Sequence, residues 1–179
     1  MNNPPKVFIS YSHDSDAHVD RVLAFADALR NDQVEAIIDR NIPNPPEGWP
    51  HWMSHHLDTA DFVLLICTKE YHDRVERRQP AGTGRGVQWE GTIIYNRIYN
   101  NPNVGDRFIP ILIDGGIEDN IPMPLRGFTF YRIADFALTD PSYEDLYRHL
   151  TGQPANPATP LGVRKVLPPR MRGGGVNPP

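Results

Sequence analysis

One acidic side chain lies on the apolar stripe of a helix that the sequence predicts to begin near Val87. Glu90 falls three residues after Val87 and four before Ile94, which is the register of a helix face that packs on a core. A carboxylate held there can stabilise positive charge or orient a nucleophile. It can equally be a first-turn acid, which the helix dipole favours by about 0.3–1 kcal/mol. Both interpretations stay open on position alone.

Further polar candidates come directly after two predicted strands. Tyr11, Ser12 and His13 follow the first strand, and Asp39 and Arg40 end the second. The first three are equally typical of turns and caps. The arginine has the geometry to bind a phosphate through two parallel hydrogen bonds, and the alternative is a solvated ion pair with its neighbour. We therefore keep all five as candidate ligand contacts.

Two tryptophans add flat apolar surface beside these groups. Trp49 and Trp52 are three residues apart on one face of a short predicted helix. Tryptophan stacks well on an aromatic base, although such pairs are also typical of core or rim packing. We interpret Trp49 as a ring contact because it follows a proline-rich loop.

Three other signals carry less weight. The "GTGRG" run at 82–86 follows a polar, charged insertion at 72–81 rather than a strand, so a flexible loop is favoured over a phosphate-binding fingerprint. His51 and His55 have helical i, i+4 spacing, but no third ligand accompanies them, so we predict no metal site. Cys67 ends a predicted buried strand, and we interpret it as a small residue packed in the core.

The elements that must position these groups alternate between strand and helix. This alternation predicts an α/β fold with a mostly parallel sheet and helices on both faces. Ligands of such sheets bind beyond the carboxyl ends of the strands, where the candidates lie. Pro110 lies in the fourth predicted strand. A proline there suggests either that it is near the end of the strand or that the strand is at the edge of the sheet. The predicted strands cover 6–12, 34–39, 61–68, 107–113 and 128–133, and the predicted helices cover 13–33, 49–59, a stretch from about 87, and 142–150.

The first of these helices is the best specified. Val19, Val22, Ala26 and Leu29 form its apolar stripe, and Asp14 or Ser15 is the expected cap.

Composition narrows the classes of function. The chain has 179 residues, 39% hydrophobic content and a net charge of −4, which favour a globular domain without a nucleic-acid-binding surface. No apolar run reaches the length of about 18 residues that a membrane span needs, and the N-terminus lacks the pattern of a secretory signal. A single cysteine excludes an internal disulfide. We therefore expect a cytoplasmic protein.

Proline and glycine mark the predicted domain boundary. We expect one domain over residues 1–152 and a Pro/Gly-rich linker or disordered tail over 153–179. Such a tail typically tethers a partner protein or a sensor module.

Five motifs, taken in order, resemble the TIR superfamily, and more closely its SEFIR branch in bacterial proteins. They are "VFISYSHDS", "VEAIID" with its proline-rich loop, "WPHWMSHHLDTADFVLLICTKEY", "GVQWEGTIIYNRIY" and "RFIPILI". The resemblance covers roughly residues 6–150. It implies a flavodoxin-like fold with a five-stranded parallel sheet.

The resemblance also implies a chemistry for the candidate residues. Many bacterial TIR domains cleave NAD at the nicotinamide–ribose bond, often as defence effectors that assembly activates. Glu90 matches their catalytic glutamate, whereas Trp89 directly precedes it rather than lying about four residues earlier. The loop Tyr11–His13 matches the family's adenine and nicotinamide contacts. NAD is then a substrate, and no resident cofactor or metal is implied.

Two other functions remain as alternatives. One is a non-enzymatic signalling scaffold, in which the loop 39–48 docks onto another TIR or SEFIR domain in homotypic association. The other is a domain that binds a nucleotide signal and turns nothing over.

Overall fold

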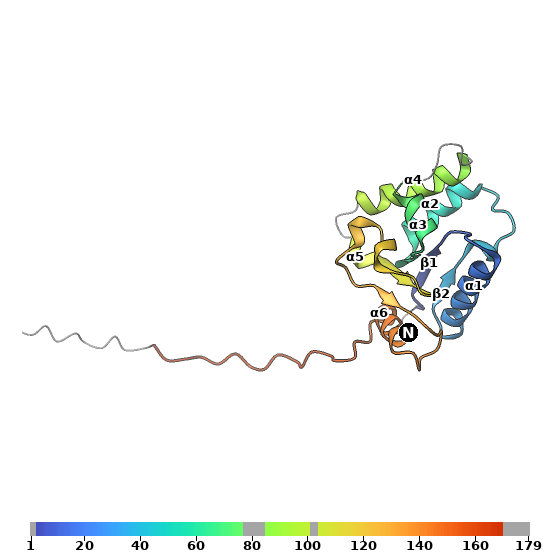
Figure 1. The fold of residues 1–179 in the computed structure, drawn as a ribbon. Helices are drawn as coiled ribbons and strands as arrows, with labels where there is room; N and C mark the ends of the chain where they lie inside the picture. The colour runs from blue at the N-terminus through green and yellow to red at the C-terminus, as the bar shows by residue number, and fades with distance from the viewer. Residues whose placement is uncertain (1–2, 77–84, 101–103, 170–179) are drawn as a thin grey trace, which may run out of the picture.

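Five parallel strands form a single sheet in the order β2-β1-β3-β4-β5 (Figure 1). The computed structural model describes residues 3–76, 85–100 and 104–169, with 85–91 described by their backbone alone. This strand order confirms the predicted α/β flavodoxin-like fold. The strands are β1 (Lys6–Ser10), β2 (Glu35–Ile37), β3 (Phe62–Ile66), β4 (Phe108–Leu112) and β5 (Tyr131–Arg132).

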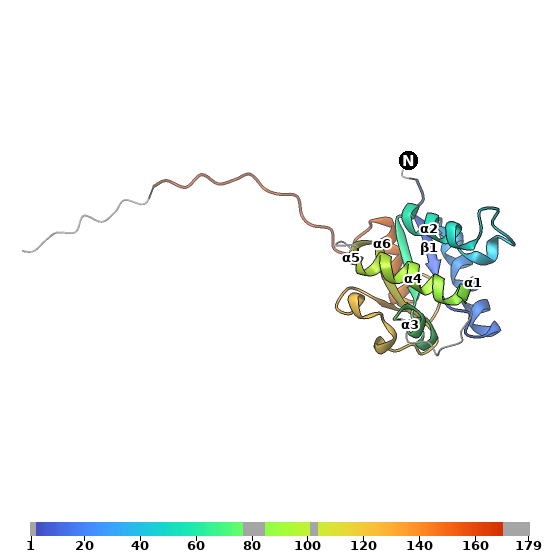
Figure 2. The ribbon, with the colours of Figure 1, turned by 90° about the horizontal axis from the view of Figure 1, so that it is seen from above.

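Helices cover both faces of the sheet (Figures 1 and 2). The face covered by α1 (Asp16–Asn31) and α6 (Pro141–Thr151) holds one buried apolar cluster. A second cluster lies on the opposite face. The elements on that face are α2 (Trp49–Thr59), α3 (Lys69–Val75), α4 (Arg85–Tyr99), α5 (Val104–Arg107) and the 3₁₀ turn η3 (Met123–Leu125). Two further 3₁₀ turns, η1 (Asp39–Asn41) and η2 (Glu118–Asn120), lie in connections.

The first helix forms as its sequence predicts. Ser15, one of the two expected caps, accepts a hydrogen bond from the backbone N–H of His18, which satisfies one of the free donors of the first turn. The predicted stripe is buried, and it packs on the sheet at helical spacing.

The central strand is buried on both sides. The side chains of Leu64 and Ile66 join the cluster under α1 and α6, whereas Val63 and Leu65 join the opposite one. Strands covered on both faces lose polar alternation, which is why the run 62–67 is apolar throughout.

Pro110 corrects one expectation. It lies in the middle of β4, which pairs with β3 on one side and β5 on the other, so β4 is not an edge strand. The carbonyl of Ile111 accepts a hydrogen bond from Cys67 on the β3 side. Because neighbouring residues alternate in direction, the nitrogen of Pro110 points toward β5, which pairs only from Ile111 onward. The missing N–H therefore breaks no hydrogen bond of the sheet.

Two other predictions need revision. Residues 69–75 form α3, so the first part of the predicted insertion 72–81 is helical, and residues 77–84 lie outside the described residues. The fifth strand is also much shorter than predicted, because only Tyr131 and Arg132 pair with β4.

The chain leaves the domain after α6. Gly152 adopts a left-handed conformation at the end of this helix, which typically terminates it. Residues 153–169 form no helix or strand and are exposed, and they extend away from the domain (Figure 2). None of the helices in the described residues has the length and apolar character to cross a membrane. The division at residue 152 and the cytoplasmic location stay predictions.

Candidate functional site

A cavity of about 420 Å³ lies near the carboxyl ends of β1 and β2, beside the point where the strand order reverses between β1 and β3. In open α/β sheets this reversal is the usual place for a ligand. The cavity is within the size range of about 300–1,000 Å³ that is typical of small-molecule sites. Its described lining residues are Phe8, Ile9, Ser10, Tyr11, His13, Asp39, Trp49, Trp52, Met53, Tyr71, Arg74, Val75 and Ile94.

Asp39 is the anionic centre of one wall. Its Oδ1 accepts a hydrogen bond from the Tyr11 hydroxyl at 2.7 Å, and its Oδ2 lies 2.9 Å from Nε2 of His13. The Tyr11 and His13 rings also contact each other, with centroids 5.0 Å apart. One carboxylate thus ties the loop after β1 to the 3₁₀ turn η1 that follows β2, although 26 to 28 residues separate the partners.

These contacts set the protonation of the wall. Burial raises the pKa of Asp39, but hydrogen bonds from His13 and Tyr11 outweigh it and hold the pKa below its ordinary value. Burial and the neighbouring Asp39 raise the pKa of Tyr11. At neutral pH the site therefore presents a carboxylate and a phenol that keeps its proton.

Aromatic rings form the wall supplied by α2. The rings of Trp49 and Trp52 meet edge to face at 5.6 Å, and Trp52 meets Phe8 in the same way at 5.7 Å. Trp52 is buried, whereas Trp49 is 38% exposed at the end of the proline-rich loop. An exposed indole anchored by a buried one is well placed to stack on a planar ligand.

A further wall comes from α3. The side chain of Thr68 caps this helix by accepting from the backbone N–H of Tyr71, whose hydroxyl lies 2.9 Å from Oγ of Ser10. Arg74 follows one turn later, and its Nη2 donates to Oε1 of Glu70 at 2.7 Å. Arg74 brings a permanent positive charge to the cavity that Asp39 also lines.

The structure brings four of the sequence candidates to this cavity and leaves two beside it. Tyr11, His13, Asp39 and Trp49 line it. The two candidates that do not line it are Ser12 and Arg40. Ser12 is fully buried; its hydroxyl donates to Asp14 and contacts Thr68. Arg40 is exposed, and its charge acts on Tyr11.

The two candidates on α4 have a different status. Trp89 and Glu90 lie within the helix, but their side chains are outside the described residues. Ile94, four residues after Glu90, lines the cavity. The role of both residues stays a prediction.

The wall formed by α3 is not among the candidates that the sequence predicts. Tyr71, Arg74 and Val75 have the i, i+3, i+4 spacing of one helix face, and Thr68 is a common capping residue. That pattern was the available signal, but seven residues are too few to establish a period.

The described residues offer no group of three or more His, Cys, Asp or Glu side chains that could hold a metal ion. Cys67 is buried, and burial raises the pKa of its thiol, which disfavours the reactive thiolate.

A family model and one solved structure identify the same family. A family model described as "SEFIR domain" matches residues 5–148. The crystal structure of a prokaryotic SEFIR domain is similar, with 31% identity and a TM-score of 0.65, over 88% of this chain and 99% of that chain. A metazoan TIR-STING receptor from C. gigas, solved in complex with 2',3'-cGAMP, matches at 18% identity and a TM-score of 0.56. That match covers 90% of this chain and 43% of the receptor and shows the fold alone. No curated protein sequence matches significantly.

Proposed function

The chain belongs to the SEFIR domain family, and we propose that it cleaves NAD at the nicotinamide–ribose bond, releasing nicotinamide and a linear or cyclised ADP-ribose. The observation that carries the proposal is the cavity at the strand-order reversal, which combines an exposed indole, a carboxylate and a guanidinium. A dinucleotide offers a matching group for each: aromatic rings, ribose hydroxyls and a pyrophosphate.

The reaction calls for a carboxylate near the ribose. The bond between the ribose anomeric carbon and the nicotinamide nitrogen breaks, and its electron pair leaves with the now neutral nicotinamide. Positive charge develops on the ribose, which an ionised carboxylate stabilises. Water, or a nucleophilic atom of the same molecule, then bonds to the carbon and loses a proton. We assign the carboxylate to Glu90, one helical turn before Ile94 of the lining.

The other candidates take binding roles. Asp39, held by Tyr11 and His13, accepts hydrogen bonds from ribose hydroxyls. Trp49 stacks on one of the rings, with Trp89 as a second aromatic contact from α4. Arg40 contributes positive charge at the rim, and Ser12 fixes the loop through Thr68. The domain acts as a bacterial antiphage effector that self-assembly or a partner on the tail activates.

The test is nicotinamide release from NAD by the wild-type chain, both free and in enforced clusters. Glu90→Gln keeps the size of the side chain, removes its charge and lowers the rate by about 100-fold or more. Glu118→Gln, at a side chain that is 66% exposed, is the matched control and leaves the rate unchanged. Clustered protein that releases no nicotinamide would refute the activity, and cleavage that survives Glu90→Gln would refute the assignment.

A scaffold function is the second candidate, and one observation favours it. Pro43, Asn44, Pro46 and Glu47 are exposed in the loop before α2, as a surface for homotypic docking requires. In that case Pro46→Asp blocks self-association, measured by light scattering, in a protein that does not release nicotinamide.

A further inference from the structure

Arg74 has spare hydrogen-bonding capacity beside the cavity. Its side chain is 17% exposed, and its Nη2 donates to Glu70. The Nε is buried and finds no acceptor among the described residues. A guanidinium has five N–H donors and no acceptor, so this side chain can bind a further oxygen-rich group.

An ordinary helix-surface ion pair does not account for this burial. Glu70 and Arg74 have the favourable i, i+4 order, but the glutamate is 43% exposed while its partner is largely buried. On α6, Glu144 and Arg148 have the same spacing and a similar distance of 2.6 Å, and both are exposed to similar extents at 40% and 37%. The pair on α3 is thus asymmetric, with the cation turned toward the cavity.

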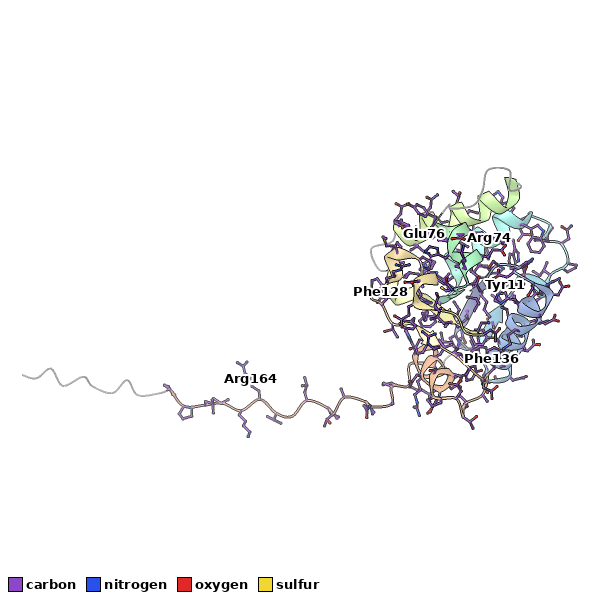
Figure 3. The ribbon with its side chains drawn as sticks, in the orientation of Figure 1. Tyr11, Arg74, Glu76, Phe128, Phe136 and Arg164 are labelled. Atoms are coloured by element: carbon purple, nitrogen blue, oxygen red, sulfur yellow. The ribbon has the colours of Figure 1, made fainter. Side chains whose placement is uncertain are left out.

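A second donor lies on the same cavity. Trp52 is 3% exposed, and its Nε1, which can only donate, also lacks an acceptor among the described residues. Figure 3 shows Arg74 on α3 and Tyr11 after β1 in the same part of the domain. The lining therefore has excess donors on the α2 and α3 walls and an acceptor carboxylate at Asp39.

We propose that Arg74 binds the phosphate groups of the nucleotide, with Glu70 as an internal carboxylate that competes with them. This assignment rests on the proposed function, because it names the contact of the same cavity with the pyrophosphate of NAD or ADP-ribose. The base then lies toward Trp49 and the ribose toward Asp39. Arg74 is a binding residue and takes no part in bond cleavage.

Two substitutions with opposite expected effects test the contact by calorimetry with ADP-ribose. Arg74→Gln removes charge-assisted hydrogen bonds and weakens binding about 10- to 100-fold. Glu70→Gln removes the competitor and strengthens binding about two- to fivefold, a range set by the strength of exposed ion pairs. A merely structural pair would give both variants the same loss. Arg148→Gln, which breaks the similar pair on α6, leaves binding unchanged.

Adenosine, which lacks phosphate, is the ligand control. The affinity for adenosine is the same in Arg74→Gln as in wild type, and the melting temperature of the variant verifies that it is folded. Arg74→Lys keeps part of the ADP-ribose affinity because it keeps the charge. The proposal is overturned if wild-type protein does not bind ADP-ribose, or if Arg74→Gln binds it as tightly as wild type. Nicotinamide release is measured on the same samples. Release that persists with unchanged KM in Arg74→Gln refutes only this contact, whereas Arg74-dependent binding without any release refutes only the cleavage.

Discussion

Replacing Tyr11 by phenylalanine separates the contribution of the site to folding stability from its contribution to ligand binding. The change removes the hydroxyl that donates to Asp39 at 2.7 Å and keeps the ring against His13. The molecule contains a matched control outside the cavity lining, where the hydroxyl of Tyr143 donates to Asp32 at 2.8 Å. The two variants lose the same type of hydrogen bond, but only one of them lies at the cavity.

The structure indicates how much unfolding free energy each variant loses. A hydrogen bond to a charged group contributes about 1.5–3 kcal/mol. Asp39 keeps His13 as a second donor and is 25% exposed. The loss of stability in Tyr11→Phe is therefore at the lower end of this range, at about 1.5 kcal/mol. Tyr143 is completely buried, so the loss of stability in Tyr143→Phe approaches about 3 kcal/mol. For a domain of this size the melting temperature falls by about 3–6 °C and about 6–12 °C, respectively.

Thermal unfolding and ADP-ribose calorimetry on both variants complete the experiment. Tyr11→Phe weakens binding about three- to tenfold, because Asp39 loses one of the two donors that orient its carboxylate. Tyr143→Phe is less stable but binds as wild type does at a temperature where it is folded. Equal binding by the two variants would show that the Tyr11–Asp39 contact serves folding only.

Two further predictions concern pH and packing. The folded pKa of Asp39 lies below its ordinary value, so its contribution to stability is complete above about pH 4 and is lost as pH falls through the folded pKa. The difference in urea unfolding free energy between wild type and Asp39→Asn therefore shrinks on acidification, and a constant difference would contradict the assignment. At Gly105 an added methyl group would overlap the ring of Phe128, so Gly105→Ala lowers the melting temperature despite the better helix propensity of alanine. Adding Phe128→Ala restores most of that loss, and no recovery would show that the strain lies elsewhere.

Local patterns were sufficient for most of the fold. The stripe that begins with Val19 and Val22, together with the cap at Ser15, specified α1 within a few residues. The continuous apolar run of β3 indicated a strand covered on both faces. The prediction from Pro110 was wrong because a proline is tolerated inside a sheet wherever no acceptor lies opposite its nitrogen. Whether an acceptor lies there depends on how far the neighbouring strand extends, which the sequence does not show.

The edge of the site could also be predicted, because parallel strands bring their carboxyl ends together. That rule placed Tyr11 and Asp39 on the same side before any contact was known. The partner of Asp39 could not be predicted. The sequence suggested the adjacent Arg40, but consecutive residues of a helical turn do not face each other. The observed partners, Tyr11 and His13, are more than 25 positions away in the chain.

The wall from α3 shows why charge has to be interpreted together with burial. In the sequence, Glu70 and Arg74 have the same spacing as Glu144 and Arg148, and nothing local distinguishes the two pairs. Only packing separates them, because α3 lies on the cavity and its arginine is less than half as exposed as its counterpart on α6. A buried guanidinium with an unused donor costs free energy unless an anion binds it. If Arg74 binds the phosphates as proposed, ADP-ribose raises the melting temperature of the wild-type chain more than that of Arg74→Gln.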